Sequence, residues 1–503
     1  MQVRNKAVKK LLGHYREISL LGKTEAVLGW DLNVNLPPKA SGDRAEQISQ
    51  LTSIITDKWH DTEFRETLEG LVSDTSNLNQ YERAIVRNLV YASKFYYRVP
   101  KKIIVRFSDT TSKSFMAWQQ ARKDDNFKAF LPHLRRVIEL NVQIAEHLGY
   151  EDNPYDALLD LYEQGLTTRE MGNVFKILKN EISLLLKTIK KSKHYGNETQ
   201  LLSRENTYSK SDQEKIALFA LEKIGYDLDA GRMDVSAHPF TTHFSVNDVR
   251  ITNRYGESDF TESIMVALHE GGHALYEQGV DPSYEHTPLS GGVSLGIHES
   301  QSRFWENQIG RSREFAKFLT PVLKSFYPGQ LRGVEELDIY RKFNIVRPSL
   351  VRVEADEVTY NLHVALRFDL ENKLINGKVA AKDLPEIWRS MMKSYLGVVP
   401  QTDADGVMQD VHWSYGSFGY FPTYTLGNLY AAQFTQKMSR DFPLKKLVEA
   451  GNLTSILRWQ RKNIHRHGSL YWPDEMIKKV TSKPLDPNYF VKYLKRKYTK
   501  LYS

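Results

Sequence analysis

An apolar repeat of three to four residues is the feature that most limits what this chain can fold into. Apolar side chains recur at i, i+3, i+4 and i+7 through residues 8–15, as they do on one face of an α-helix. The same period returns in three later stretches, 83–95, 132–148 and 213–224. Strand-like alternation is rare between them, so the sequence predicts a mainly α fold with a helical scaffold in its first half.

The charges of the chain are numerous and almost balanced. Among 503 residues, 69 Lys and Arg oppose 61 Asp and Glu, and 41% of positions are hydrophobic. Such a composition supports a large core and excludes disordered and fibrous classes, while a net charge of +8 spread this thinly predicts no nucleic-acid partner. Basic residues are concentrated only near the C-terminus, where helical spacing favours a solvated helix face over a polyanion contact: Lys492, Lys495, Arg496, Lys497 and Lys500.

Cysteine is absent from the sequence. Its absence excludes disulfide frameworks, thiolate zinc sites and cysteine nucleophiles. Any metal must therefore be held by His, Asp or Glu.

The hydropathy pattern predicts neither export nor membrane insertion. Residues 1–21 are basic, keep charges through their apolar part and have no small-residue cleavage signature. No segment approaches 18 consecutive apolar residues. We therefore expect a cytoplasmic protein without a membrane partner, in which the glycosylation-like sequon Asn197-Glu198-Thr199 is accidental.

One stretch of the sequence has the character of β structure. Residues 240–255 are rich in Val, Ile, Thr, Phe and Tyr on both sides of Asn247-Asp248, which predicts a small β-hairpin or sheet there. The following segment, Asp259 to Glu262, has the spacing of a capping box. A helix is expected from this cap to about Gly279.

That helix contains the sequence His269-Glu270-Gly271-Gly272-His273, an HExxH motif. Four residues rise about 6 Å and complete slightly more than one turn, so both imidazoles project from one face and can bind one metal ion. Glu270 lies about 100° around the helix, where its carboxylate can serve as a general base. Two glycines inside a helix cost about 1 kcal/mol each, which indicates that a substrate or another helix approaches closely.

Two histidines do not complete a catalytic zinc site, which needs a third protein ligand and an open position. Glu299 is the candidate for that ligand, and its neighbour His298 is the competitor. The turn PLSGGVSLG lets the chain double back and lay a second helix beside the first. A His, Glu, His set suits polarisation of a carbonyl, which favours Glu299.

Six short motifs follow one another in the middle of the chain: HPF at 238–240, DVRIT at 248–252, HEGGH at 269–273, HESQS at 298–302, VRVEADE at 351–357 and GVMQDVHW at 406–413. In these blocks and in their order the chain closely resembles the carboxypeptidase Taq family of metal-dependent carboxypeptidases. The resemblance is dense over about 234–428, whereas the N-terminal half is similar mainly in helical character. Trp30-Asp31-Leu32 and Leu36-Pro37 depart from the family's frequent WDQ and MP.

The resemblance implies one divalent metal per chain, zinc, for which cobalt can substitute. His269, His273 and Glu299 would bind the metal, and Glu270 would be the base. The family fold is mainly helical around a deep active-site groove, and homodimers are usual, so we expect both features here.

We see no linker or repeat that would divide the chain, and therefore expect one large helical peptidase domain over 1–503. Within it we distinguish an N-terminal scaffold at about 1–235, a metal and substrate region at about 236–430 and C-terminal helices at about 431–503.

A carboxypeptidase must recognise a terminal carboxylate, and a planar guanidinium binds that group with two hydrogen bonds. Arg352 and Arg250 are the candidates. Each also has acidic neighbours in the sequence and can instead form a structural ion pair.

The tetrahedral oxyanion needs a hydrogen-bond donor, and three residues that can donate cluster in QDVHWSYGSFGYFPTYTLGN. His412 and Tyr420 are the candidate catalytic donors, and Tyr424 is a candidate for substrate binding. Packing is the ordinary role of a tyrosine, since the chain has 27. His238 of the HPF motif either lines the groove or closes a turn.

These observations predict an enzyme that releases C-terminal amino acids from peptides by attack of a metal-activated water, with Glu270 as general base. A metalloendopeptidase with the same centre in an open cleft is the nearest alternative. An aminopeptidase is disfavoured because no GxMEN-like segment is present to hold a free amine. A non-catalytic helical binding protein would leave the HExxH motif, Glu299 and both helix glycines as coincidences.

Overall fold

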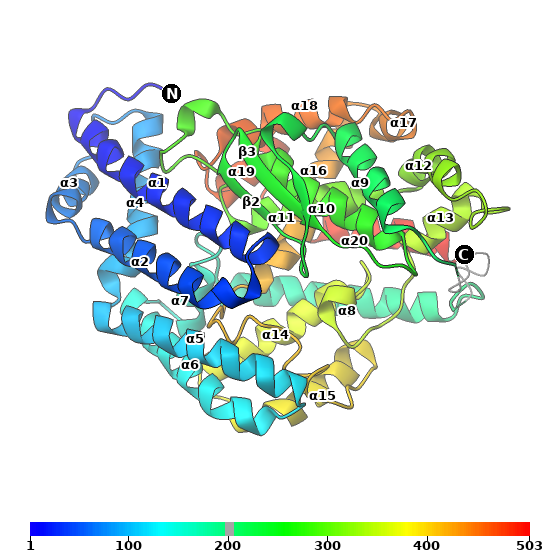
Figure 1. Ribbon diagram of the computed structural model, residues 1–503, viewed down its shortest axis with the longest axis horizontal. Helices are drawn as coiled ribbons and strands as arrows, with labels where there is room; N and C mark the ends of the chain where they lie inside the picture. The colour runs from blue at the N-terminus through cyan, green and yellow to red at the C-terminus, as the bar shows by residue number, and fades with distance from the viewer. Residues whose placement is uncertain (197–205) are drawn as a thin grey trace. The chain divides into compact units, whose positions relative to one another are not determined.

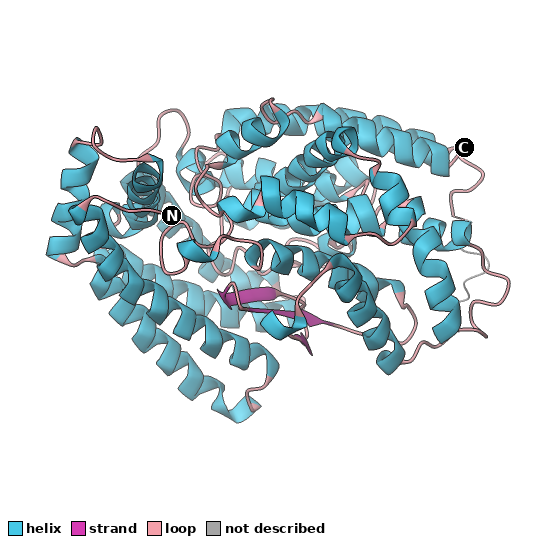
Figure 2. Ribbon diagram, turned by 90° about the horizontal axis from the view of Figure 1, so that it is seen from above, coloured by secondary structure: helices cyan, strands magenta, loops and turns pink. Residues whose placement is uncertain are grey.

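Helices carry most of the regular structure of this protein, and among the residues that the structure describes the strands lie in one short stretch (Figure 2). The computed structural model describes residues 1–196 and 206–503, so the sequon Asn197-Glu198-Thr199 lies outside the described residues. The mainly α fold predicted from the sequence is confirmed. The four stretches with an apolar repeat lie in the helices α1, Lys6–Val34, α4, Gln80–Arg98, α6, Phe127–Leu148, and α9, Lys210–Ile224.

Contacts within the chain divide it into two compact units, each made from three separate stretches. The first unit comprises Met1–Ser93, Thr199–Phe343 and Tyr430–Leu485, and the second comprises Lys94–Glu198, Asn344–Leu429 and Asp486–Ser503. Organisation as a single domain around a groove stays a prediction.

The first unit contains the N-terminal helices and the small sheet (Figure 1). Besides α1, α9 and most of α4, its helices are α2 Ser41–Trp59, α3 Thr62–Ser73, α10 Thr261–Glu277, α11 Leu295–Arg303, the π-helix Phe304–Gly310, α12 Arg313–Phe326, α13 Glu336–Phe343, α17 Leu444–Glu449, α18 Thr454–Asn463 and α19 Pro473–Thr481. Short 3-10 turns occur at Pro38–Ala40, Leu228–Ala230, Pro282–Tyr284 and His465–His467.

The described residues of the second unit form helices, turns and loops without a strand. Its helices are α5 Lys101–Lys123, α6, α7 Pro154–Leu159, α8 Thr168–Lys190, α14 Tyr360–Ile375, α15 Leu384–Leu396 and α20 Asn488–Leu501, with 3-10 turns at Arg352–Glu354 and Ala381–Asp383. The helix α16, Pro422–Asp441, runs across the boundary between the two sets of residues.

The sheet has three strands in the order β1, β3, β2. The strands β2, Thr241–Ser245, and β3, Asp248–Asn253, form the antiparallel hairpin expected near 240–255. The strand β1, Met233–Val235, adds in parallel to β3 and was not predicted, because three residues are too few to show a strand period.

Helix α10 is packed closely on two sides where its glycines lie. A Cβ on Gly271 would come within 2.7 Å of Leu221 in α9, and a Cβ on Gly272 would come within 2.5 Å of the Gln301 carbonyl in α11. The close approach predicted from the two glycines is therefore made by two helices, one on each side. This packing fixes α10 beside α11.

The predicted capping box at the start of α10 is wrong. The helix begins at Thr261, whose backbone N–H and hydroxyl both donate to the Asp259 carboxylate at 2.7 and 2.6 Å. Glu262 does not reach back to the cap, because its carboxylate pairs with Arg254.

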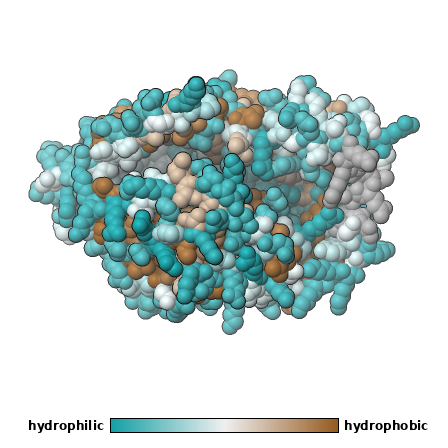
Figure 3. All heavy atoms as spheres, turned by 60° about the horizontal axis from the view of Figure 1, so that its bottom comes forward, coloured by the Kyte–Doolittle hydropathy of each residue, from teal (hydrophilic) through white to brown (hydrophobic). Residues whose placement is uncertain are grey.

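Polar residues cover most of the face drawn in Figure 3, with single hydrophobic residues scattered between them. No helix within residues 1–196 or 206–503 is long and apolar enough to span a membrane. In the basic run of α20, Lys495 pairs with Glu181 and Lys497 pairs with Glu357. The side chain of Lys497 is thus mostly buried, whereas the other four basic residues of the run are exposed, as a solvated face predicts.

Candidate metal centre

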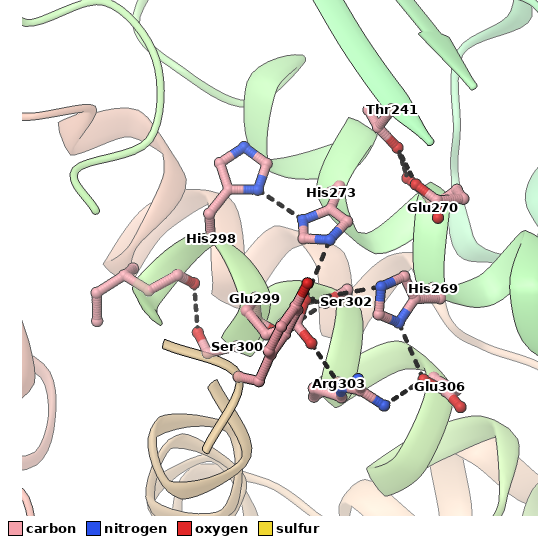
Figure 4. Close-up of polar contacts among 12 residues, drawn as sticks. Thr241, His269, Glu270, His273, His298, Glu299, Ser300, Ser302, Arg303 and Glu306 are labelled. Carbon is pink, nitrogen blue, oxygen red and sulfur yellow. Dashed lines mark hydrogen bonds and ion pairs between the residues drawn. The ribbon is translucent and has the colours of Figure 1, made fainter. Parts of the chain in front are cut away.

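The two histidines of the HExxH motif lie one turn apart on α10 and point to the same place (Figure 4). The Nε2 atom of His273 is 3.3 Å from Oε2 of Glu299, and Nε2 of His269 is 3.6 Å from the same oxygen. Glu299 comes from α11, the helix that the turn after α10 lays alongside. Three potential ligand atoms thus converge from two helices.

These three side chains have the chemistry of a divalent-metal site. Each offers one ligand atom and all three atoms lie within 4.8 Å of one another, which is true of no other such group among the residues described. Burial would raise the pKa of Glu299, but Arg303 and the two histidines hold it well below its usual range. Burial also lowers the pKa of His273 to about 4. An ionised carboxylate beside an unprotonated imidazole fits a cation.

The imidazole of His269 is supported by a carboxylate on its other nitrogen. Its Nδ1 atom lies 2.9 Å from Oε2 of Glu306, which the π-helix after α11 provides. Arg303 joins the two carboxylates, since its guanidinium donates to Glu299 at 2.6 Å and to Glu306 at 3.2 Å. A carboxylate in this position fixes Nδ1 as the protonated nitrogen and leaves Nε2 free.

The imidazole of His273 is supported by a second imidazole. Its Nδ1 atom lies 2.6 Å from Nδ1 of His298, and Nε2 of His298 lies 2.7 Å from Oε1 of Glu277. His298 therefore contacts the nitrogen of His273 opposite the one that faces Glu299 (Figure 4).

Glu270 belongs to the same helix and stands outside this group of three. Its Oε2 atom accepts a hydrogen bond of 2.6 Å from the hydroxyl of Thr241 in β2 (Figure 4). The side chain is buried, and burial raises its pKa. A buried carboxylate with a raised pKa and one hydrogen-bonded oxygen has the properties of a general base.

Two substrate candidates also belong to the first unit. Arg250 in β3 donates two hydrogen bonds of 2.8 Å to Asp248, and its guanidinium lies 4.8 Å from the centre of the Phe244 ring. The side chain of His238 is exposed, while its backbone carbonyl accepts from the Ser236 hydroxyl at 2.7 Å. Arg250 is thus in an ion pair, and the backbone of His238 closes a turn.

In the second unit, Arg352 is buried and paired with Asp410, and not with the acidic residues that follow it in the sequence. It donates to Asp410 through Nε at 3.0 Å and to the hydroxyl of Tyr360 through Nη1 at 2.9 Å. Arg367 donates to the other oxygen of Asp410 at 2.6 Å. Two buried guanidiniums therefore share one carboxylate.

The remaining candidates gather near that cluster. Nε2 of His412 is 3.2 Å from the hydroxyl of Tyr424, and the Tyr420 ring centre lies 5.2 Å from that of His412. The guanidinium of Arg352 lies 4.8 Å from the centre of the Tyr424 ring. Burial lowers the pKa of His412 to about 3, so this imidazole is neutral near pH 7.

Three residues that contact this site were not predicted from the sequence: Thr241, Glu277 and Glu306. Glu306 follows Glu299 by seven residues, a helical spacing that could have suggested it. Glu277 likewise follows His273 by four. No sequence signal indicates Thr241, because its contact depends on how the hairpin packs on α10.

Known proteins match this chain over nearly its whole length. The family described as Carboxypeptidase Taq (M32) metallopeptidase matches residues 10–498. Thermostable carboxypeptidase 1 of Pyrococcus furiosus is 44% identical over 496 residues, which cover 98% of this chain and 99% of that protein. Carboxypeptidase 1 of Bacillus subtilis is 37% identical over 495 residues, 98% of both chains.

Solved structures have the same fold. A Pyrococcus furiosus carboxypeptidase structure superposes with a TM-score of 0.95 at 43% identity and covers 99% of both chains. The M32 carboxypeptidase of Deinococcus radiodurans gives 0.94 at 36% identity, over 99% of this chain and all of the other.

Proposed function

Because the chain belongs to the carboxypeptidase Taq (M32) family and is a metal-dependent carboxypeptidase, we propose that His269, His273 and Glu299 hold its divalent cation and that Glu270 is the general base. The observation that carries this proposal is the convergence of the three ligand atoms within 4.8 Å. When bound, a divalent cation polarises the scissile carbonyl and lowers the pKa of water.

Glu270 is the residue that moves the proton in this proposal. Its carboxylate takes a proton from the attacking water and gives it to the leaving amine, so that the base becomes the acid in the second step. The hydrogen bond from Thr241 holds one carboxylate oxygen. The side chain is then held in one rotamer, in which its other oxygen can face the attacking water.

We propose zinc as the resident ion, with cobalt as a substitute, at one ion per chain. Two imidazoles and one carboxylate form the ligand set of several zinc hydrolases, and sites of this kind bind other first-row metals as well. One Pyrococcus furiosus carboxypeptidase structure is described as Apo-Mg, so magnesium is the ion to compare directly.

For the substrate carboxylate we favour Arg352 over Arg250. Arg250 forms a closed pair with one carboxylate, whereas Arg352 and Arg367 share Asp410 and leave an excess positive charge. An excess of buried positive charge favours an anionic ligand.

His412 and Tyr420 are proposed as donors to the oxyanion, and Tyr424 as a substrate contact. The aromatic cluster that they form with one another supports a common role. His238 is retained as a substrate-binding candidate because its imidazole is exposed. We further propose that the enzyme acts on peptides as a cytoplasmic homodimer.

The metal and base assignments are tested together with Glu270→Gln. This variant should keep about one divalent metal per chain and lose about 10²- to 10⁴-fold in kcat, because the base is not a ligand. Metal content and rate are measured on one preparation. Glu262→Gln is the matched control on the same helix, since its carboxylate pairs with Arg254 at the surface. Near-normal turnover in Glu270→Gln would reject the assignment.

The anchor for the substrate is tested with three forms of one short peptide: free, C-terminally amidated and N-acetylated. The free and acetylated forms should be trimmed stepwise from the C-terminus. The amide should be cut at least about thirtyfold more slowly than the free peptide, since it cannot form the ion pair. This preference should collapse in Arg352→Ala and persist in Arg250→Ala. The opposite result would transfer the role to Arg250, and equal internal cleavage of all three forms would indicate an endopeptidase.

A further inference from the structure

The two proposed imidazole ligands are supported in different ways. His269 contacts the carboxylate of Glu306 directly, at 2.9 Å, whereas His273 contacts the imidazole of His298 (Figure 4). His298 in turn contacts Glu277. The chain from His273 to Glu277 has two short links, of 2.6 and 2.7 Å. Each link joins two side chains that are at least three-quarters buried.

Glu277 sets the direction of this hydrogen-bond chain. Burial would raise its pKa, but nearby His243 and the bond from His298 lower it to about 2. An ionised carboxylate only accepts, and Glu277 also accepts from the Gly292 backbone N–H at 3.1 Å. Nε2 of His298 must therefore carry a proton and donate a hydrogen bond to Glu277.

The next link follows from that proton. When the ring proton of His298 lies on Nε2, which faces Glu277, Nδ1 presents a lone pair to His273 and can only accept. Nδ1 of His273 must then donate, and this places the lone pair of His273 on Nε2, the atom that faces Glu299. The opposite tautomer of His298 would leave a proton on Nε2 of His273, where the metal must bind.

We propose that His298 and Glu277 are positioning residues that fix the tautomer and orientation of His273 for metal binding. This inference rests on the proposed function, because it takes His273 as a ligand. His298 itself binds neither metal nor substrate, and acts only through His273.

Two substitutions at His298 separate the links. In His298→Asn the amide oxygen takes the place of Nδ1, so the acceptor for His273 is kept and the hydrogen bond to Glu277 is lost. In His298→Gln the amide nitrogen takes the place of Nε2, so Glu277 keeps a donor and His273 loses its acceptor. Glu277→Gln retains an acceptor oxygen without the negative charge.

Zinc affinity is measured by chelator competition on the folded protein, with the absorption spectrum of the cobalt-substituted protein as a second readout. His298→Gln should lose about 10- to 100-fold in affinity and shift the cobalt spectrum. His298→Asn and Glu277→Gln should each lose less than about tenfold. Equal zinc affinities of the two His298 variants, or a lower affinity in His298→Asn than in His298→Gln, would overturn the proposal.

His465 provides a matched control for a purely structural effect. Its ring lies 5.1 Å from Tyr276, as that of His298 lies 5.3 Å from the same residue, but its polar partner is Gln301. His465→Gln should lower the thermal midpoint of the metal-free protein and leave zinc affinity unchanged. If Glu299→Ala keeps wild-type affinity, the metal site itself is misassigned. If Glu299→Ala loses affinity and His298→Gln does not, only the positioning role fails.

Discussion

The two units each contain a buried carboxylate with basic groups on both of its sides, and only the first carboxylate faces imidazoles as well as a guanidinium. In the first unit, Oε2 of Glu299 faces the imidazoles of His269 and His273, and Oε1 accepts from Arg303. In the second unit, Asp410 lies between the guanidiniums of Arg352 and Arg367. In both clusters, burial opposes ionisation and the neighbouring basic groups lower the pKa of the carboxylate.

The difference decides which ligand each cluster can accept. An imidazole can present a lone pair to a metal, whereas a guanidinium has only N–H donors and stays protonated. The first cluster also has three further buried carboxylates within its network, Glu270, Glu277 and Glu306. It is therefore suited to a cation, and the second cluster, with two positive charges around one negative charge, is suited to an anion.

The largest expected effect separates the two clusters by metal affinity. Glu299→Ala should weaken zinc binding by about 10²- to 10⁴-fold, because one of three protein ligands is lost from a binding free energy of about 10–16 kcal/mol. His298→Ala should lose much less, and Asp410→Ala should bind zinc as the wild type does. Competition with a chelator would rank the zinc affinities of the three variants. A lower affinity in His298→Ala than in Glu299→Ala would move the ligand role to His298.

The second prediction concerns charge balance in the arginine cluster. Asp410→Asn leaves two buried guanidiniums without a counter-charge and should destabilise the fold by about 3–5 kcal/mol. Arg352→Met leaves the neutral pair of Arg367 and Asp410 and should cost less. Thermal unfolding of both variants and of the double variant would check this. The double variant should recover part of the loss, and a purely additive loss would contradict the account.

Sequence patterns predicted the elements that depend on local order. The apolar repeat gave α1, α4, α6 and α9, and β-branched and aromatic residues gave the hairpin of β2 and β3. The HExxH spacing also predicts the convergence of His269 and His273, because it is set within one helix.

Features that depend on distant partners could not be predicted in this way. Arg352 pairs with Asp410, 58 positions further along the chain, and not with the acidic residues beside it. The capping box failed because Arg254 competes for Glu262. Glu306 lies in the π-helix Phe304–Gly310, which no local propensity indicates, although its spacing from Glu299 is helical.

The third prediction concerns how the stability of the fold depends on pH through one buried acid near the arginine cluster. Glu371 lies one turn after Arg367 on α14, and burial raises its pKa from 4.5 to about 7. The folded state therefore binds this proton more tightly than the unfolded state does. The resulting stabilisation of about 3 kcal/mol is present below pH 4.5 and is lost as the pH rises to about 7.

The Glu371→Gln variant cannot ionise and should remove this dependence. Its thermal midpoint should change less between pH 4.5 and 7 than the wild-type midpoint does. Trp413 donates to one oxygen of the wild-type carboxylate at 2.7 Å and the Gly419 N–H to the other at 2.9 Å. An amide has only one acceptor oxygen, so the variant should be less stable than the wild type at pH 4.5. Parallel curves for the two proteins would show that Glu371 does not titrate in this range.

The smallest effect is expected at the base. Thr241→Val removes the hydroxyl that holds Glu270 and should lower kcat by about tenfold, or about 1.4 kcal/mol, with unchanged zinc content. Thr241→Ser keeps the donor and should retain most of the activity. Equal rates for the two variants would show that the hydrogen bond does not position the base.

The central claim is that the cluster around Glu299 holds the metal, and a zinc-edge anomalous difference map of zinc-loaded crystals tests it most directly. The account predicts one peak per chain, about 2.0–2.2 Å from Nε2 of His269, Nε2 of His273 and a carboxylate oxygen of Glu299. A peak bound instead by His298 and Glu277, or beside Asp410, would contradict it.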